Sequence, residues 1–182
     1  MVTDEILLER LQGGRDSALE TLLGRYQKPL YSFAFRMLGS RENAEDAFQE
    51  TFIRVHRRRM TFRKGARFRP WLYQICLNVC RDQLRRKKAR REVQLCEEAV
   101  GADTALSPQE RLERSLQREK VRTAILDLPQ KQRDVLVLSQ YHDLSHEEIA
   151  EVLNIPVGTV KSRKHTALRS LAKRLQKEFP KK

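Results

Sequence analysis

The chain has 182 residues, a formal net charge of +13 and a pI near 10.1, so an anionic partner such as nucleic acid or an acidic lipid surface is the first expectation. Its apolar runs are too short to span a membrane, its acidic N-terminus is unlike a signal peptide, and three cysteines do not make a disulfide framework. These features predict a reduced, cytoplasmic protein without direct membrane insertion.

The repeating patterns along the chain are helical. Apolar residues recur at three- and four-residue spacing and alternating, strand-like runs are missing, so the predicted fold class is all-α. Two helices are expected between residues 3 and 38, separated at the glycine pair of "QGGRDS". A third is expected over residues 40–58, where Ser40 can cap the first turn and Glu42 lies near the positive end of the helix.

The exposed side of this third helix carries a mixed surface. On a helical projection the polar strip that lies opposite the apolar side, and contains one apolar residue, consists of Asp46, Gln49, Glu50 and Ile53. Such a strip suits contact with a protein partner, and an ordinary solvated surface is the alternative. Asp46 and Glu50 lie one turn apart, but no nearby His or Lys would complete a catalytic site, so catalysis by this pair is not supported.

The segment "TFRKGARFRPWLY" (residues 61–73) places aromatic rings among cations and contains no acid. We expect an exposed loop that is interrupted at Gly65, followed by a fourth helix that starts at Pro70. Exposed rings beside cations suit stacking on the bases of single-stranded nucleic acid, whereas a membrane-surface segment would need a broad apolar face. The candidate nucleic-acid contacts in this segment are Phe62, Arg63, Lys64 and Phe68.

The fourth helix, over residues 70–91, has two distinct sides. The expected buried stripe consists of Leu72, Ile75, Cys76 and Val79. The opposite, polar stripe consists of Gln74, Asn78, Arg81, Arg85 and Lys88. Cations alone would also suit lipid headgroups, whereas the amide side chains of this stripe favour hydrogen bonds to bases and phosphates. Cys76 and Cys80 lie one turn apart, and core packing is the favoured explanation over a zinc or redox site.

A change in composition divides the chain near residue 91. Residues 53–91 contain fifteen Lys or Arg and one acid, whereas residues 92–110 contain five acids and no Lys or Arg. Helical periodicity also fades here, which predicts one domain over residues 1–95, a flexible acidic linker over residues 96–107 and a second domain over residues 108–182. Ser107, Pro108 and Glu110 indicate where the first helix of the second domain begins.

The C-terminal part predicts a helix-turn-helix. Ser145 and Glu148 form a capping box for a short helix, which Asn154 can end and after which Pro156 opens a longer, basic helix. This is the arrangement of DNA-reading proteins, although a plain solvated face is the alternative for the long helix. Its inward side is expected to hold Val160, Ala167, Leu168, Leu171 and Leu175. Its candidate DNA contacts are Thr159, Lys161, Ser162, Arg163, His165, Thr166 and Arg169.

The motifs "NAEDAFQETFIRVHR", "FRKGARFRPWLYQICLNVCRDQLRR" and "LPQKQRDVLVLSQYHDLSHEEIAEVLNIPVGTVKSR" follow one another in this order. Together they resemble a bacterial extracytoplasmic-function (group IV) sigma factor. The resemblance implies a protein that binds core RNA polymerase, at its clamp coiled coil and its flap, and directs it to promoters. It also implies that the strip at Asp46 docks on the coiled coil. The loop and the fourth helix, with Asn78, would read the −10 element as single strands, and the helix-turn-helix would read the −35 element as duplex.

The same resemblance implies that the acidic linker enters the polymerase cleft where RNA later runs, and that the chain has no catalytic task and no cofactor. An anti-sigma factor is a partner of many relatives, although no residue of this chain requires one. The chain departs from the family pattern at Lys164, Thr166 and Leu168. Two other hypotheses are a stand-alone helix-turn-helix regulator and a metal-dependent nuclease using "HDLSHEE"; the cap at Ser145 argues against the second, because it should keep His142 and His146 from sharing a face.

Overall fold

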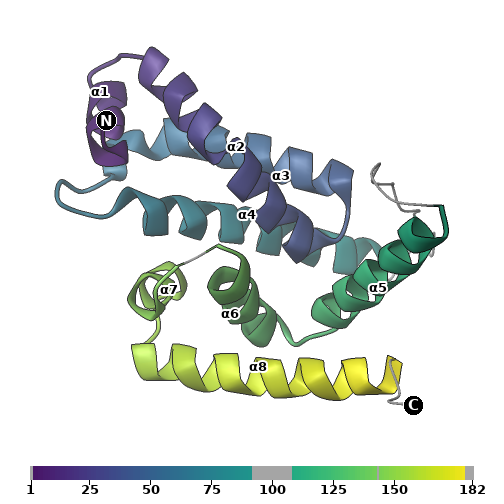
Figure 1. Ribbon diagram of the computed structural model, residues 1–182. Coiled ribbons are helices and arrows are strands. Elements are labelled where there is room, and N and C mark those ends of the chain that lie inside the picture. Colours follow the sequence, from purple (N-terminus) through teal and green to yellow (C-terminus); the bar gives the residue numbers. More distant parts are fainter. Residues whose placement is uncertain (1, 92–107, 143, 179–182) are drawn as a thin grey trace.

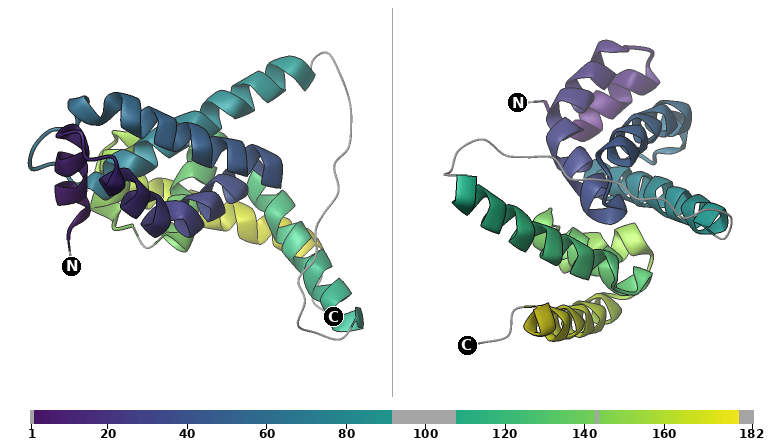
Figure 2. Two further views of the ribbon diagram at one scale, coloured as in Figure 1. Left: turned by 90° about the horizontal axis from the view of Figure 1, so that it is seen from above. Right: turned by 90° about the vertical axis from the view of Figure 1, so that its right-hand side faces the viewer.

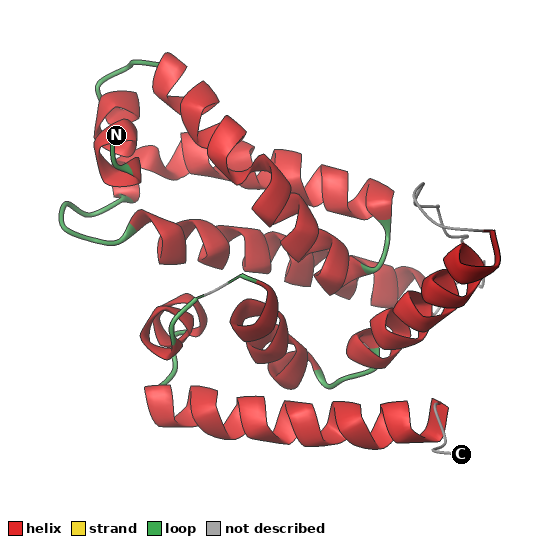
Figure 3. Cartoon of the chain, viewed as in Figure 1, coloured by secondary structure: helices red, strands yellow, loops and turns green. Residues whose placement is uncertain are grey.

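The computed structural model describes residues 2–91, 108–142 and 144–178, and within them it is helical without any strand (Figure 1, Figure 3). The all-α prediction is therefore confirmed. A short 3-10 turn, Arg59–Thr61, follows α3. The helices are α1 Asp4–Gln12, α2 Ser17–Leu38, α3 Arg41–Arg58, α4 Phe68–Arg91, α5 Pro108–Leu126, α6 Gln130–Tyr141, α7 His146–Leu153 and α8 Val157–Glu178.

Helix ends predicted from local side chains are found where expected. The Ser40 hydroxyl accepts a hydrogen bond from the Asn43 N–H at 3.3 Å, and Ser145 and Glu148 form a complete capping box on α7. Asn154 ends α7 in the left-handed conformation, at φ 51°. These three interactions join residues at most four positions apart, so the local sequence determines them.

One predicted helix start is wrong by two residues. The fourth helix was expected to begin at Pro70, but α4 begins at Phe68, whose N–H donates to the Glu5 carboxylate of α1 at 3.0 Å. This carboxylate satisfies one of the free N–H groups at the positive end of the helix. Pro70 is then the third helical residue, where its missing N–H removes no hydrogen bond within the helix.

The N-terminal half is built around α2, which packs against α1, α3 and α4. The predicted buried stripe of α4 is confirmed, because its four members are between 0% and 3% exposed. They meet large apolar side chains from α2, which are Leu22, Leu30, Phe33 and Met37. Burial of such side chains is the main source of folding free energy in a helical bundle.

The C-terminal half packs α8 across α6 and α7, with Val160 and Ala167 fully buried. Leu171 is half-buried, but Leu168 is 41% exposed, so its predicted inward position is wrong. Residue 168 lies 100° around the helix from Ala167, which occupies the centre of the buried side. The helix-turn-helix itself is present as α7 followed by α8.

The two halves share one core. Figures 1 and 2 show the N-terminal helices stacked on the C-terminal ones, with α6 and α7 between α4 and α8. The ring of His142, at the end of α6, contacts Phe33 of α2 and Tyr73 of α4 at centroid distances of 5.3 and 5.4 Å. The prediction of two helical domains is confirmed, and here they are in direct contact. Residues 96–107, the predicted linker, lie outside the described residues.

His142 is a neutral member of this core. Its ring is 5% exposed, and its Nδ1 is 3.2 Å from the Tyr73 hydroxyl. Burial, followed by the positive charges of Arg36 and Arg69, lowers the pKa of His142 to about 4. The ring is therefore uncharged at neutral pH, which suits its position between two aromatic rings.

A close approach between the halves occurs at Gly39, which ends α2 with φ 74°. A Cβ at this position would lie 2.5 Å from Leu126 Cδ1 of α5. Arg122 of α5 donates to the Gly39 carbonyl, and its guanidinium lies 5.8 Å from the centre of the Phe35 ring. Glycine is favoured here by the left-handed conformation, and any other residue would also require the Leu126 side chain to move.

An ion pair crosses the boundary between the halves. Arg81 of α4 donates to Asp134 Oδ2 of α6 at 2.6 Å, and the two side chains are 30% and 1% exposed. Burial raises the pKa of Asp134, and the positive charge of Arg81 opposes that rise only in part. Asp134 Oδ1 has no hydrogen-bond partner within the described part of the chain. The buried carboxylate thus depends on Arg81 more than Arg81 depends on it.

This asymmetry predicts unequal costs for removing the two partners. Arg81→Ala should lower the free energy of unfolding at pH 7 by about 3 kcal/mol, because the buried carboxylate loses its hydrogen bonds to Arg81 and keeps only the more distant charges of Arg133 and Arg163. Asp134→Asn should cost less, because Arg81 can reach water. A raised pKa means that the folded protein retains a proton that the unfolded chain has lost, so stability falls as pH rises from 3.8 through the raised value. Urea denaturation should therefore show a larger deficit for Arg81→Ala at pH 7 than near pH 4.

The control is the double variant Arg81→Ala/Asp134→Asn, which contains neither charge. It should regain most of the stability lost in Arg81→Ala and lose the extra pH dependence. If Asp134→Asn alone costs as much as Arg81→Ala, the carboxylate is not the dependent partner and this account of the pair is wrong.

Candidate nucleic-acid interface

The strip predicted on α3 is exposed as expected. Asp46, Gln49 and Ile53 lie on the surface, and Ile53 is one of the few large apolar side chains with more than 40% exposure among the described residues. Glu50 is partly covered, because its carboxylate accepts from Arg54 at 2.7 Å. Arg54 also donates to Asp82 of α4 at 3.1 Å, which holds α3 against α4 below the strip. An exposed Ile among polar groups, on a fixed helix, is suited to contact with a protein.

The loop between α3 and α4 differs from the prediction in one respect. Phe62 and Phe68 were predicted as nucleic-acid contacts in an exposed loop, but their side chains are buried, at 8% and 0% exposure. Phe62 packs against Trp71 at a centroid distance of 5.2 Å, and Phe68 against Tyr26 at 5.7 Å. The rings anchor the loop because burying an aromatic side chain removes a large apolar area from water.

The cations of this loop, by contrast, do lie on the surface. Arg63 and Lys64 are exposed and directly precede Gly65, whose φ is 83°. Arg67 is also exposed and pairs with Glu151 of α7. The loop thus presents positive charge to solvent from a base of buried rings.

The polar stripe of α4 runs along the edge of the contact with the C-terminal half. Asn78 is exposed and Gln74 is half-buried. Arg85 is exposed and paired with Asp82, one turn before it. Arg81 is engaged by Asp134, so it is not free to meet a ligand in this arrangement. Lys88 lies in α4, and its side chain is outside the described ones.

Helix α8 lies on the far side of α6 and α7 from the N-terminal helices (Figure 1). Five of its seven predicted contacts are exposed, which are Lys161, Ser162, His165, Thr166 and Arg169, whereas Thr159 and Arg163 are half-buried. The hydroxyls of Ser162 and Thr166 donate to backbone carbonyls of the same helix at 3.1 and 3.0 Å. Their oxygens remain able to accept hydrogen bonds from a ligand. This face offers cations, an imidazole and hydroxyl acceptors along one side of a straight helix.

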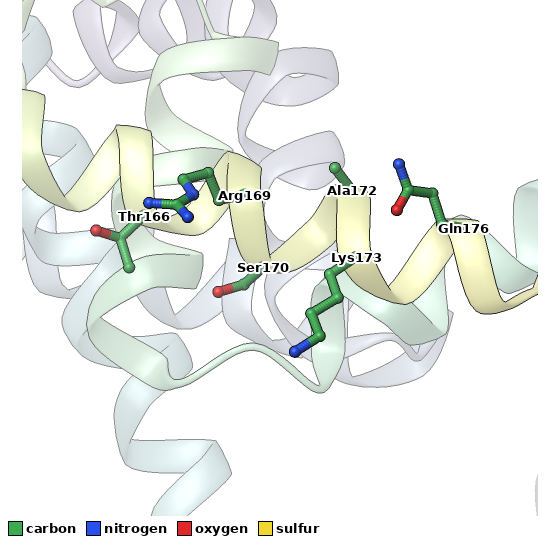
Figure 4. A pocket seen from close by; sticks show the side chains of 6 residues that line it. All are labelled: Thr166, Arg169, Ser170, Ala172, Lys173 and Gln176. Carbon is green, nitrogen blue, oxygen red and sulfur yellow. The ribbon is translucent and has the colours of Figure 1, made fainter.

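The C-terminal continuation of this face is shown in Figure 4. Thr166, Arg169 and Lys173 border a shallow hollow of about 460 Å³ that is lined by α8 alone. A surface formed by one helix encloses no small molecule, but it fits the side of a larger ligand. Among the described residues there is no group of three His, Cys, Asp or Glu side chains that could hold a metal ion. His142, which the nuclease hypothesis would use as a metal ligand in "HDLSHEE", is buried in the core.

Sequence reasoning missed three kinds of contact. It did not identify the ion pair of Asp134, although this acid directly precedes the apolar run "VLVL" of α6 and is buried with it. It did not connect His142 with Tyr73, which lies 69 residues away. It also missed the contacts of Glu5 and Gln12 with the loop, for which the sequence carries no local signal.

Comparison with known proteins agrees with this geometry. The family model described as Sigma-70 region 2 matches residues 22–90, and that described as Sigma-70, region 4 matches residues 118–171. The structure is similar to that of CnrH in complex with the cytosolic domain of CnrY, with a TM-score of 0.74 and 25% identity over 95% of this chain and 97% of the other. Within the described residues, no helix combines the length and apolar character that crossing a bilayer requires.

Curated relatives match along almost the whole chain. The ECF RNA polymerase sigma factor SigW of Bacillus subtilis is 34% identical over 93% of this chain and 95% of its own length. The ECF RNA polymerase sigma-E factor of Escherichia coli is 34% identical over 96% of this chain and 95% of its own. The two matched regions and these full-length similarities show that the chain belongs to the sigma-70 family, as an ECF RNA polymerase sigma factor.

Proposed function

We propose that the N-terminal half of this sigma factor binds core RNA polymerase and the −10 element, while α8 reads the −35 element. The chain would have no catalytic task of its own, since the polymerase supplies the chemistry, and it would act in the cytoplasm. The observation that carries the proposal is the face of α8, whose cations and hydrogen-bonding groups are mostly exposed to solvent. A recognition helix in the major groove uses such a face.

Polymerase binding is assigned to the α3 strip. Ile53 would provide an apolar contact with the clamp coiled coil, surrounded by Asp46 and Gln49. The ion pairs of Arg54 with Glu50 and Asp82 support this assignment, because they fix the strip before a partner arrives. The flap of the polymerase would meet the C-terminal half.

Recognition of the −10 element is assigned to the loop and to α4. Arg63 and Lys64 would bind phosphates of the separated strands, and Asn78 would hydrogen-bond a base. With Phe62 and Phe68 buried in this arrangement, stacking on bases by these two rings would require the loop to open. Arg81 would contact the DNA only after its ion pair with Asp134 has broken.

The −10 and −35 surfaces are therefore not equally available in this arrangement. The α8 face is open, whereas part of the α4 stripe is engaged at the boundary between the halves. We expect the polymerase to separate the halves and to hold them at promoter spacing. The acidic segment over residues 96–107, which lies outside the described residues, would then enter the polymerase cleft.

Transcription from purified components tests the proposal. The protein is mixed with bacterial core RNA polymerase and DNA of its source genome, and the 5′ ends of the transcripts are sequenced. Transcripts that begin at shared −10 and −35 sequences are expected, and Ile53→Asp should abolish them without unfolding the protein. The complete lack of specific transcripts with the wild-type chain would rule the proposal out. Tight promoter binding by the protein alone would instead favour a stand-alone regulator.

Asn78→Ala tests the assignment on α4. The side chain is exposed, so its loss should leave folding and polymerase binding unchanged. Loss of a base contact should lower the yield of open complexes by about tenfold and weaken discrimination between −10 sequences. Permanganate reactivity of unpaired thymines measures the opening. Gln27→Ala, at an exposed position of α2, is the matched control and should behave as wild type. An Asn78→Ala protein that opens promoters normally contradicts the assignment.

The recognition helix allows base contacts to be distinguished from phosphate contacts. Substituting Ser162 or His165 by Ala should change which −35 sequences are used, by about 1–3 kcal/mol per lost base contact. Substituting Lys161 or Arg163 should weaken all sites alike and reduce the salt dependence of binding by about one unit of slope. Transcription from a library of −35 variants at several salt concentrations measures both. If Lys161 or Arg163 alters sequence preference and His165 does not, the helix enters the groove in a different rotation.

A further inference from the structure

Helix α1 lies across the end of the N-terminal half, directly beside the loop that joins α3 to α4 (Figure 1). Leu7, Leu8 and Leu11 anchor it in the core, at 4%, 0% and 0% exposure. The region 2 family model begins at residue 22, so α1 lies outside the matched segment. Its polar side chains nevertheless make specific contacts with both ends of the loop.

The first contact fixes the start of the loop. The side-chain amide of Gln12 donates from Nε2 to the carbonyl oxygens of Arg59 and Phe62, at 2.7 and 3.3 Å. An amide nitrogen carries two hydrogens, so one side chain can satisfy both carbonyls. Arg59 begins the 3-10 turn Arg59–Thr61 and Phe62 follows it, at the point where the chain leaves helical structure. Gln12 thus determines the direction in which the loop begins.

The second contact fixes the end of the loop. The Glu5 carboxylate accepts the Phe68 N–H at 3.0 Å, where α4 begins. Helix α1 is itself held in place, because Asp4 accepts a hydrogen bond from the Tyr26 hydroxyl at 2.6 Å and pairs with Arg25. The Tyr26 ring in turn packs on Phe68. The loop is therefore held at both ends by one helix, while Arg63 and Lys64 at its tip lie on the surface.

We propose that α1 sets the geometry of the −10-reading loop, with Gln12 and Glu5 as positioning residues. This rests on the proposed function, in which Arg63 and Lys64 bind the separated strands. A loop with both ends fixed presents its cations in one arrangement, so less ordering is needed when DNA binds. Without these contacts the cations remain present, but their positions relative to Asn78 vary. The effect should appear as lost discrimination at the −10 element.

The sharpest variant is Gln12→Glu. It keeps the size and shape of the side chain but removes both N–H donors and places a carboxylate against two carbonyls. Gln27→Glu, at an exposed position of α2, is the matched control because it makes the same change of charge. For the second contact, Glu5→Ala is compared with Glu9→Ala, an exposed position of the same helix.

The measurement is transcription with core polymerase from promoters found by sequencing transcripts of the source genome. Each promoter is paired with one version changed at −10 and another changed at −35. In Gln12→Glu and Glu5→Ala, the preference for the original −10 sequence should fall about five- to tenfold, while the −35 preference stays at the wild-type value. Competition for core polymerase should be unaffected, and both controls should match wild type.

Comparing the −10 preference with the −35 preference distinguishes a positioning role of α1 from a general structural effect. Partial unfolding lowers the active fraction, which reduces transcription from every promoter alike and leaves both preferences unchanged. An unchanged −10 preference in the folded variants overturns the proposal, and so does an equal fall at −10 and −35. If Gln12→Glu does not fold, Gln12→Ala and Glu5→Ala decide, and failure of all three to fold would make α1 a purely structural element. A wild-type chain without specific transcripts would instead refute the proposed function.

Discussion

The ring of His142 lies against Phe33 of α2 and Tyr73 of α4, and this contact joins the two halves of the molecule into one core. The ring can occupy that position because burial and the nearby Arg36 and Arg69 keep it uncharged. Around it the packing of α4 on α7 and of α2 on α5 and α6 is continuous. Together with these helix contacts, it sets how α4 and α8 lie relative to each other.

Helix α4 consequently has two roles that use adjacent sides. One side belongs to the shared core, and the neighbouring side carries the amides and cations assigned to DNA. Arg81 stands between them and is held by a buried carboxylate. Helix α8 lies on the opposite side of the C-terminal half, and five of its seven candidate contacts are exposed. A single packing arrangement thus leaves most of one candidate DNA-binding surface exposed and partly engages the other.

The parts of this structure that could be predicted from the sequence depend on neighbours along the chain. The capping box of Ser145 and Glu148 and the helix end at Asn154 are interactions within one turn, and the sequence shows both partners together. The periodic apolar residues of α4 likewise identify its buried side. Helical spacing therefore located the buried and polar sides of α4, but not the residues that pack against them.

The errors concern partners that are distant in sequence. A segment of mixed rings and cations is compatible with exposed or buried rings, and the choice at Phe68 depends on Tyr26, 42 residues earlier. The start of α4 depends on Glu5, and the state of Arg81 on Asp134. None of these pairings has a periodic signal, because each forms only when helices from different parts of the chain meet.

The shared core also limits how freely the two regions can be exchanged between members of the family. Asp134 and His142 belong to the C-terminal region, but the residues that accommodate them, Arg81, Phe33 and Tyr73, belong to the N-terminal one. A chimera that received only one region from a relative would join an acid or an imidazole to an unmatched surface. Each region of this chain therefore packs against residues of the other, and exchanging both regions together should preserve stability better than exchanging one.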